Sequence, residues 1–298
     1  MLRGSLVPLI TPFRDGRIDE SRFDDLLEWQ IESGSQGVVT GGTTGEPAAL
    51  SLDEREALVA RAVRVARRRV PVVAGTGTNN LEETLRLTAA AKKAGAAAVL
   101  VVVPYYVRPS QEGLYRYFRT VAESVDLPVI LYNIPGRTAV NLEASTIVRL
   151  ARDVRNIIGV KEANKDFEHI NRVFHLAPQG FLVYSGIELF CFSLLALGGA
   201  GHGSATGNVM PREVARLYDL AAAGKWDEAR ELHNYLLPMN EILFIETNPV
   251  PVKTALGLMG RIAPEVRPPL APLAPENAER LRGVLAQYGL LAPAPVSS

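Results

Sequence analysis

Eight short apolar runs, separated by segments of helical length, constrain the fold of this chain more than any other feature. The runs are rich in β-branched residues and span residues 6–10, 37–40, 70–74, 99–103, 129–132, 157–160, 181–184 and, more weakly, 201–205. Nearly continuous apolar strands joined by helices are typical of a parallel sheet that is covered on both faces. Eight such units without a break predict an α/β protein with a closed (β/α)8 TIM barrel rather than an open, doubly wound sheet.

The segments between the runs have the periodicity of helices. In residues 53–69, Leu58, Ala62 and Val65 recur at helical spacing, while arginines take most of the opposite face. A second such segment covers residues 21–33. These segments predict an outer layer of helices around the barrel.

The last quarter of the chain follows a different pattern. Helices are expected at 211–223, 226–246 and 251–259, and irregular proline-rich segments at 264–275 and 293–298. We therefore divide the chain into a catalytic barrel (1–225) and a C-terminal helical region (226–298).

Composition excludes several classes of function. The 32 basic and 32 acidic residues balance, so neither nucleic acid nor an anionic membrane is expected as a partner. The single cysteine, Cys191, excludes an internal disulfide. The four histidines lack the spacing of metal ligands, so no metal is expected. Without an apolar span or a signal-like N-terminus, the sequence predicts a cytoplasmic protein.

Polar residues follow most of the apolar runs, where active sites of such barrels lie. In chain order they are Thr11, residues 41–46 (Gly-Gly-Thr-Thr-Gly-Glu), 75–77 (Gly-Thr-Gly), 104–106 (Pro-Tyr-Tyr), 132–135 (Tyr-Asn-Ile-Pro), 161–162 (Lys-Glu) and 185–186 (Ser-Gly). Hydroxyl groups, glycines and one amine are therefore expected at one mouth of the barrel.

Lys161 is the only one of the six lysines that ends an apolar strand. The others fall on predicted helices, turns or loops, with Lys253 at a predicted helix start. Burial at a strand end disfavours an ammonium ion and favours the neutral amine, which can form a Schiff base. The alternative from position alone is a buried ion pair between Lys161 and Glu162 or another carboxylate.

Thr43 and Thr44 combine two hydroxyl groups with backbone N–H groups in a glycine-rich turn, which suits a carboxylate. A phosphate-binding loop is disfavoured because the Gly-Lys-Ser/Thr ending is missing. By itself the motif is equally compatible with an ordinary tight loop.

Tyr132 and Arg137 flank the fifth strand end. Tyr132 could carry protons if it met another hydroxyl group, although a buried tyrosine capped by a carbonyl is commoner. Arg137 could clasp a carboxylate with two hydrogen bonds, although an ordinary surface arginine is the alternative.

Taken together, these residues resemble the dihydrodipicolinate synthase / N-acetylneuraminate lyase family over nearly the whole chain. The likeness rests on the motifs at residues 41–46, 132–135 and 159–163. It implies a barrel with a C-terminal helical region, assembled as a homotetramer. It also implies that pyruvate binds Lys161 as a Schiff base, without any cofactor.

The segments at residues 104–113 and 132–138 resemble the corresponding segments of the synthases of that family. This likeness implies condensation of pyruvate with aspartate 4-semialdehyde to 4-hydroxy-tetrahydrodipicolinate, in diaminopimelate and lysine biosynthesis. It implies that Tyr132 transfers protons through Thr43 to Tyr106, and that Tyr106 comes from a neighbouring subunit. It also implies that Thr44 and the Gly203 backbone bind the pyruvate carboxylate, and that Arg137 binds the carboxylate of aspartate 4-semialdehyde. Gly186 is expected to belong to the substrate pocket.

The chain departs from the family pattern in three places. Gly203 stands where a β-branched apolar residue is usual, and Glu188 lies in a segment that replaces a Ser/Gly-Asp-Asp pattern. Three residues match the family's lysine-inhibitor site: Asn79, Glu83 and Tyr105. Three others differ from lysine-sensitive bacterial members: Pro47, Leu52 and Arg55. Weak or absent inhibition by lysine is therefore expected.

Two other functions remain open from the sequence. One is a catabolic lyase or dehydratase of the same family that acts on a 2-keto sugar acid or another hydroxy-2-oxoacid. The presence of Arg137 favours the synthase over it. The other is a non-catalytic relative that binds a keto acid, which the intact Lys161, Tyr132, Thr43 and Thr44 disfavour, because binding alone does not require an amine.

Overall fold

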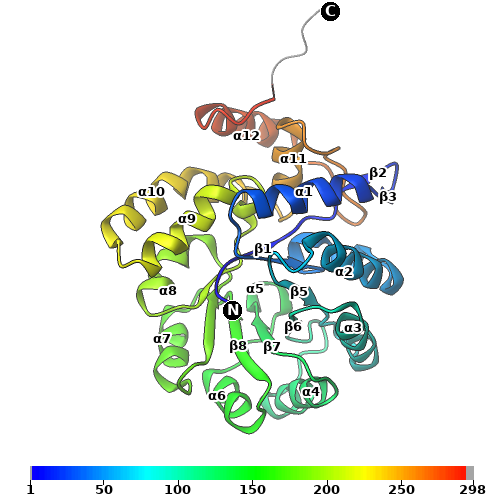
Figure 1. Cartoon of the computed structure of the whole chain (residues 1–298), viewed down its shortest axis with the longest axis vertical. Helices are drawn as coiled ribbons and strands as arrows, with labels where there is room; N and C mark the ends of the chain where they lie inside the picture. Colours follow the sequence, from blue (N-terminus) through cyan, green and yellow to red (C-terminus); the bar gives the residue numbers. More distant parts are fainter. Residues whose placement is uncertain (1, 293–298) are drawn as a thin grey trace, which may run out of the picture.

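A computed structural model describes residues 2–292 of the chain and contains a closed barrel of eight parallel strands (Figure 1). In chain order the strands are β1 (Gly4–Pro8), β4 (Gly37–Thr40), β5 (Val72–Gly75), β6 (Ala98–Val102), β7 (Val129–Asn133), β8 (Ile157–Glu162), β9 (Leu182–Ser185) and β10 (Gly201–His202). Each pairs with its neighbours in sequence, and β10 closes the barrel against β1. The predicted (β/α)8 barrel is confirmed.

The eighth strand is shorter than the predicted span of residues 201–205. Its backbone passes very close to β1, since a Cβ atom at residue 201 would lie 2.0 Å from the carbonyl oxygen of Gly4. Gly201 also has a φ angle of 152°, which residues with side chains rarely adopt. Glycine at this position is therefore needed to close the barrel.

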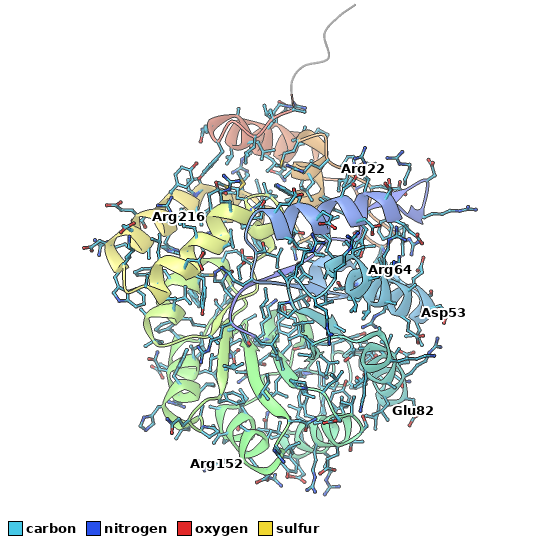
Figure 2. The ribbon with its side chains drawn as sticks, in the orientation of Figure 1. Arg22, Asp53, Arg64, Glu82, Arg152 and Arg216 are labelled. Atoms are coloured by element: carbon cyan, nitrogen blue, oxygen red, sulfur yellow. The ribbon has the colours of Figure 1, made fainter. Side chains whose placement is uncertain are left out.

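An outer layer of helices covers the barrel (Figure 1). These helices are α1 (Glu20–Glu32), α2 (Leu52–Ala66), α3 (Leu81–Ala94), α4 (Gln111–Glu123), α6 (Ala144–Asp153), α7 (Phe167–Leu176), α8 (Cys191–Ala196) and α9 (Pro211–Ala222). Charged residues labelled in Figure 2, such as Asp53 and Arg64 of α2, belong to this layer, and none of them lies in the barrel. Helix α2 begins at a capping box, in which the side chains of Ser51 and Glu54 each accept a hydrogen bond from the other's backbone N–H.

The C-terminal region contains α10 (Trp226–Ile242), α11 (Val250–Leu258) and α12 (Pro275–Gln287). The sequence interpretation missed α12, which begins at the proline that ends the predicted irregular segment 264–275. Its Leu281 and Leu285, one turn apart, are fully buried, so tertiary packing stabilises this otherwise polar helix. The second predicted irregular segment, 293–298, lies outside the described residues.

The C-terminal helices share a hydrophobic core with the barrel layer. Leu195 of α8 and Leu217 of α9 belong to the same buried cluster as Leu236 of α10, Leu256 of α11 and Leu281 of α12. In Figure 1 this region lies beside α1 and α9, above the barrel. The division at residue 225 stays a prediction. Within residues 2–292, no helix is long and apolar enough to cross a bilayer.

Candidate active site

Lys161 lies next to last in β8, with Tyr132 of β7 and Tyr184 of β9 as its register partners. It is 8% exposed, and its Nζ is 4.5 Å from the centre of the Tyr132 ring. Its side chain borders the interior of the barrel together with residues such as Leu6 and Ile130. The predicted placement of an amine at a buried strand end is therefore observed.

Two glycines leave room for this side chain. A Cβ atom at Gly186 would lie 3.1 Å from Lys161 Cε, and one at Gly203 would lie 2.9 Å from Cε and 3.1 Å from Nζ. All three distances are shorter than ordinary van der Waals contacts, so any larger residue at either position would require Lys161 to move. Gly186 and Gly203 thus lie beside the amine, where the sequence interpretation expected substrate-binding residues.

Glu162 does not pair with Lys161. Successive residues of a strand point to opposite faces, and the Glu162 carboxylate lies on the outer side of β8. There it accepts hydrogen bonds from Asn133 Nδ2 (2.9 and 3.2 Å) and Asn164 N (3.0 Å), and it lies 3.0 Å from His169 Nε2. Because these donors satisfy the carboxylate, the ion-pair alternative with this residue does not occur in the structure.

Glu188 is the acidic residue that the sequence interpretation noted as a departure from the family pattern. It is buried, and its Oε1 accepts a hydrogen bond from Ala205 N at 2.6 Å. Burial raises the pKa of this carboxyl group, and the charge of Lys161 opposes that rise. No carboxylate of residues 2–292, Glu188 included, forms an ion pair with Lys161.

The threonine turn forms a single 3-10 turn, η1 (Thr43–Gly45), directly after β4. Thr11 Oγ1 donates to Gly45 O at 2.7 Å, and Asn248 Nδ2 donates to Thr44 Oγ1 at 3.0 Å. The turn ends at Glu46, which has left-handed backbone angles (φ 56°, ψ 45°). Thr11 therefore holds the backbone at the end of the turn, and Asn248 holds the Thr44 hydroxyl group.

A cavity of about 290 Å³ opens beside this turn. Thr43, Tyr105, Arg137 and Asn248 are among the residues that line it. Arg137 projects from the short helix α5 (Pro135–Thr138), and its Nη2 donates to the backbone carbonyl of Asn248 at 2.9 Å. A smaller cavity of about 40 Å³ is bordered by Thr43, which also lines the large cavity, and by Tyr132, whose ring centre lies 4.5 Å from Lys161 Nζ.

The structure contains a second buried lysine, whose burial the sequence did not predict. Lys253 of α11 is fully buried and forms an ion pair with Glu46, and its Nζ also donates to Glu265 O at 2.8 Å. Burial lowers the pKa of Lys253 to about 8, and the adjacent Glu46 carboxylate opposes that shift. Glu46 and the Glu265 carbonyl engage the Lys253 amine, whereas no carboxylate of residues 2–292 forms an ion pair with Lys161. Lys161 is therefore the better candidate nucleophile.

Metal-ligating side chains do not gather at this site. Within residues 2–292, no group of three or more His, Cys, Asp or Glu side chains could hold a metal ion.

Comparison with known proteins decides the family. Residues 1–288 match the model of the Dihydrodipicolinate synthetase family. The chain belongs to this family. It is 50% identical over 292 residues to the 4-hydroxy-tetrahydrodipicolinate synthase of Thermus thermophilus, which covers 98% of each chain.

Solved structures of synthases have the same architecture. Dihydrodipicolinate synthase from Aquifex aeolicus superposes with a TM-score of 0.96 at 43% identity, covering 98% of this chain and 100% of that one. The chloride-inhibited dihydrodipicolinate synthase from Acinetobacter baumannii, solved in complex with pyruvate, gives a TM-score of 0.95 at 41% identity, with the same coverage. The predicted resemblance is confirmed at the level of the dihydrodipicolinate synthetase family.

Tyr106 lies apart from the other expected site residues of this family member. It is 88% exposed with a φ angle of 70°, and the neighbouring Val107 is 60% exposed. Two large exposed side chains at one loop form an apolar projection that a single chain does not cover. Within one chain, Tyr106 is therefore not part of the cavity, and its expected role depends on a second copy.

Arg55 lines the large cavity together with Tyr105, one of the three residues that match the family's inhibitor site. Arg55 is buried, and its Nη2 donates to Gly75 O at 3.0 Å. Burial lowers the pKa of Arg55, and the charges of Tyr105 and Glu83 counteract that effect. Asn79 is exposed at the start of the same segment. Arg55 thus adds a buried cation beside the cavity that Tyr105 lines.

Proposed function

We propose that this chain condenses pyruvate with aspartate 4-semialdehyde to 4-hydroxy-tetrahydrodipicolinate, the reaction for which its relatives are named. The observation that carries the proposal is the unpaired amine of Lys161, enclosed by a barrel and adjacent to Tyr132. Thr43 of the threonine turn and Arg137 line the large cavity, and the turn and the guanidinium supply groups for two carboxylates.

The chemistry follows from these groups. The Lys161 amine attacks the keto carbon of pyruvate, and loss of water leaves an imine. A proton leaves the methyl group to give an enamine, with Tyr132 as the acceptor in a relay through Thr43 to Tyr106. The enamine carbon attacks the aldehyde carbon, whose oxygen takes a proton. The amino group of the second substrate then attacks the imine carbon, which closes the ring and releases Lys161.

Thr44 and the Gly203 backbone are assigned to the pyruvate carboxylate, and Arg137 to the carboxylate of aspartate 4-semialdehyde. Gly186 is assigned to the pocket wall beside Lys161, because a side chain there would contact Cε. The imine supplies the electron sink that a cofactor would otherwise provide, so the proposed reaction uses no cofactor and no metal.

Borohydride reduction in the presence of pyruvate tests the proposal. We expect a covalent adduct of pyruvate on Lys161, located by peptide mass spectrometry, and none on the fully buried Lys253. No adduct would contradict both the synthase and the related catabolic lyase. Turnover with aspartate 4-semialdehyde, compared with a panel of 2-keto-3-deoxy acids, then separates the synthase from a sugar-acid lyase or dehydratase. Binding of pyruvate without an adduct would indicate a non-catalytic keto-acid-binding relative.

Replacing Arg137 by alanine is expected to raise the KM for aspartate 4-semialdehyde by about 10- to 100-fold, since a charged hydrogen bond to a carboxylate is lost. Borohydride trapping with pyruvate should remain unchanged. R137K should recover little, because a lysine cannot form the two parallel hydrogen bonds of a guanidinium. Steady-state kinetics with each substrate varied in turn measures this, and an equal loss in pyruvate affinity would contradict the assignment.

Inhibition by lysine is expected to be weak or absent. The Arg55 guanidinium shares a cavity with Tyr105 and interacts electrostatically with Glu83, so it should repel an incoming ammonium group. A steady-state assay with added lysine measures this, and inhibition at micromolar concentrations would overturn it. R55H should increase the sensitivity if the arginine is the cause.

We propose that the protein assembles as a homotetramer in the cytoplasm and that Tyr106 of one subunit completes the site of its neighbour. The exposed Tyr106 and Val107 support an interface at this loop. Sedimentation velocity measures the assembly state. A fully active monomer would contradict the role of Tyr106.

A further inference from the structure

Asn248, at the entry to α11, connects two residues to which the proposed function assigns substrate carboxylates. Its side-chain Nδ2 donates to Thr44 Oγ1 at 3.0 Å, and its backbone carbonyl accepts from Arg137 Nη2 at 2.9 Å. It is 7% exposed and lines the large cavity. A single residue of the C-terminal region therefore contacts both the threonine turn and the arginine of α5.

In the structure, the hydrogen bond to Thr44 runs from the Asn248 amide N–H to the hydroxyl oxygen. A threonine hydroxyl group can donate one hydrogen and accept through its lone pairs. The N–H of Asn248 occupies an acceptor position of Thr44 Oγ1, and no described residue accepts the hydroxyl hydrogen. The hydrogen is thus left free to be donated to a carboxylate.

The oxygen of the same amide, Asn248 Oδ1, makes no hydrogen bond with the described residues. It is also shielded from solvent. A buried acceptor without a partner is unfavourable, so a residue that served only to fill this space would more often be apolar. The cost is offset if the amide N–H is needed at Thr44.

A second bond between α11 and the turn fixes the same geometry. Lys253, just over one helical turn after Asn248, forms the buried ion pair with Glu46, the residue that ends η1. The backbone N–H of Arg267 also donates to Glu46 Oε2 at 3.2 Å. The start of α11 is therefore held against the turn, and Asn248 has little freedom to leave Thr44.

We infer that Asn248 is a positioning residue of this site. Its amide N–H directs the hydroxyl hydrogen of Thr44 toward the pyruvate carboxylate, and its backbone carbonyl holds Arg137 over the same cavity. The inference rests on the proposed function, because it assumes that Thr44 binds pyruvate. It gives the C-terminal region a direct part in substrate binding.

Two substitutions separate a directional hydrogen bond from simple packing. N248D preserves the shape but offers only acceptors when ionised, so it should capture the Thr44 hydrogen and repel the carboxylate. N248A removes the bond and leaves the hydroxyl group free to rotate. We expect the KM for pyruvate to rise about tenfold in N248A and about a hundredfold in N248D. A packing role predicts the opposite order, because aspartate fills the space better than alanine.

A double substitution provides a second test that does not depend on N248D folding well. With T44V as the background, N248A should raise the KM for pyruvate no further, since the hydroxyl group that it positions is already gone. The matched control is N156D. Asn156 lies just before the start of β8, at the end of the barrel opposite the carboxyl ends of the strands, where the active site is expected. Its side-chain amide donates to the carbonyls of Ala122, Val125 and Leu127. N156D should leave the KM for pyruvate unchanged.

The outcomes distinguish the inference from the proposed function. If the wild-type protein forms no pyruvate adduct under borohydride, the proposed function fails. If the wild type forms the adduct but N248D binds pyruvate as well as N248A or better, the inference fails and the function stands. Additive effects of T44V and N248A would likewise overturn it. Thermal unfolding of each variant establishes that the kinetics are those of folded protein.

Discussion

Replacing Lys161 by arginine is expected to lower kcat by a factor on the order of 10⁴ or more, as loss of a covalent nucleophile does in other enzymes. Arginine retains the length and positive charge, but its guanidinium cannot form an imine at neutral pH. Two readouts should agree: the rate of condensation and the mass of the borohydride-trapped adduct, which should be absent. Thermal unfolding should remain close to that of the wild type if the space beside Gly186 and Gly203 accommodates the larger head group.

The matched control for this prediction is K253R, at the other buried lysine. Lys253 is fully buried in its ion pair, and its predicted role is structural. K253R should lose stability but still form the pyruvate adduct on Lys161 wherever it is folded. An adduct that persisted in K161R, or that mapped to residue 253 in the wild type, would contradict the assignment of the nucleophile.

Replacing Lys253 by methionine is expected to lower the free energy of unfolding by about 3–5 kcal/mol, because it leaves the Glu46 carboxylate buried without its cation. Lys253 and Glu46 have side chains that are 0% and 1% exposed, so water cannot replace the lost partner. Urea unfolding followed by circular dichroism measures the change. The double variant E46Q/K253M should recover most of the loss, since a neutral pair carries no uncompensated charge.

A surface pair gives the comparison for this experiment. Arg230 and Asp227 lie 2.7 Å apart with side chains that are 57% and 84% exposed. R230M should change the free energy of unfolding by less than about 1 kcal/mol, as is usual for exposed pairs. Equal effects of K253M and R230M would show that burial of Lys253 contributes nothing to stability.

The sequence alone was sufficient for the barrel and for the position of its amine. Parallel strands buried on both faces must be apolar nearly throughout, so the eight runs stand out from the polar helices between them. The same rule explains why Lys161 could be found: a lysine that ends such a run cannot be an ordinary surface residue. Helix α12 was missed because its sequence is mostly polar, and Leu281 and Leu285 are its only fully buried residues.

Tertiary structure decided which buried groups have partners. Lys161 and Lys253 are both buried, but only Lys253 has a carboxylate partner among the described residues, Glu46. Glu162, which follows Lys161 in β8, turns outward instead and contacts Asn133, Asn164 and His169. The contact of Asn248 with Thr44 joins residues that are 204 positions apart. Local periodicity determines where strands and helices form, because it depends on neighbours along the chain. Whether an amine, a carboxylate or a hydroxyl group is satisfied depends on residues that only folding brings together, and so the free amine of Lys161 and the role of Asn248 emerge from the structure.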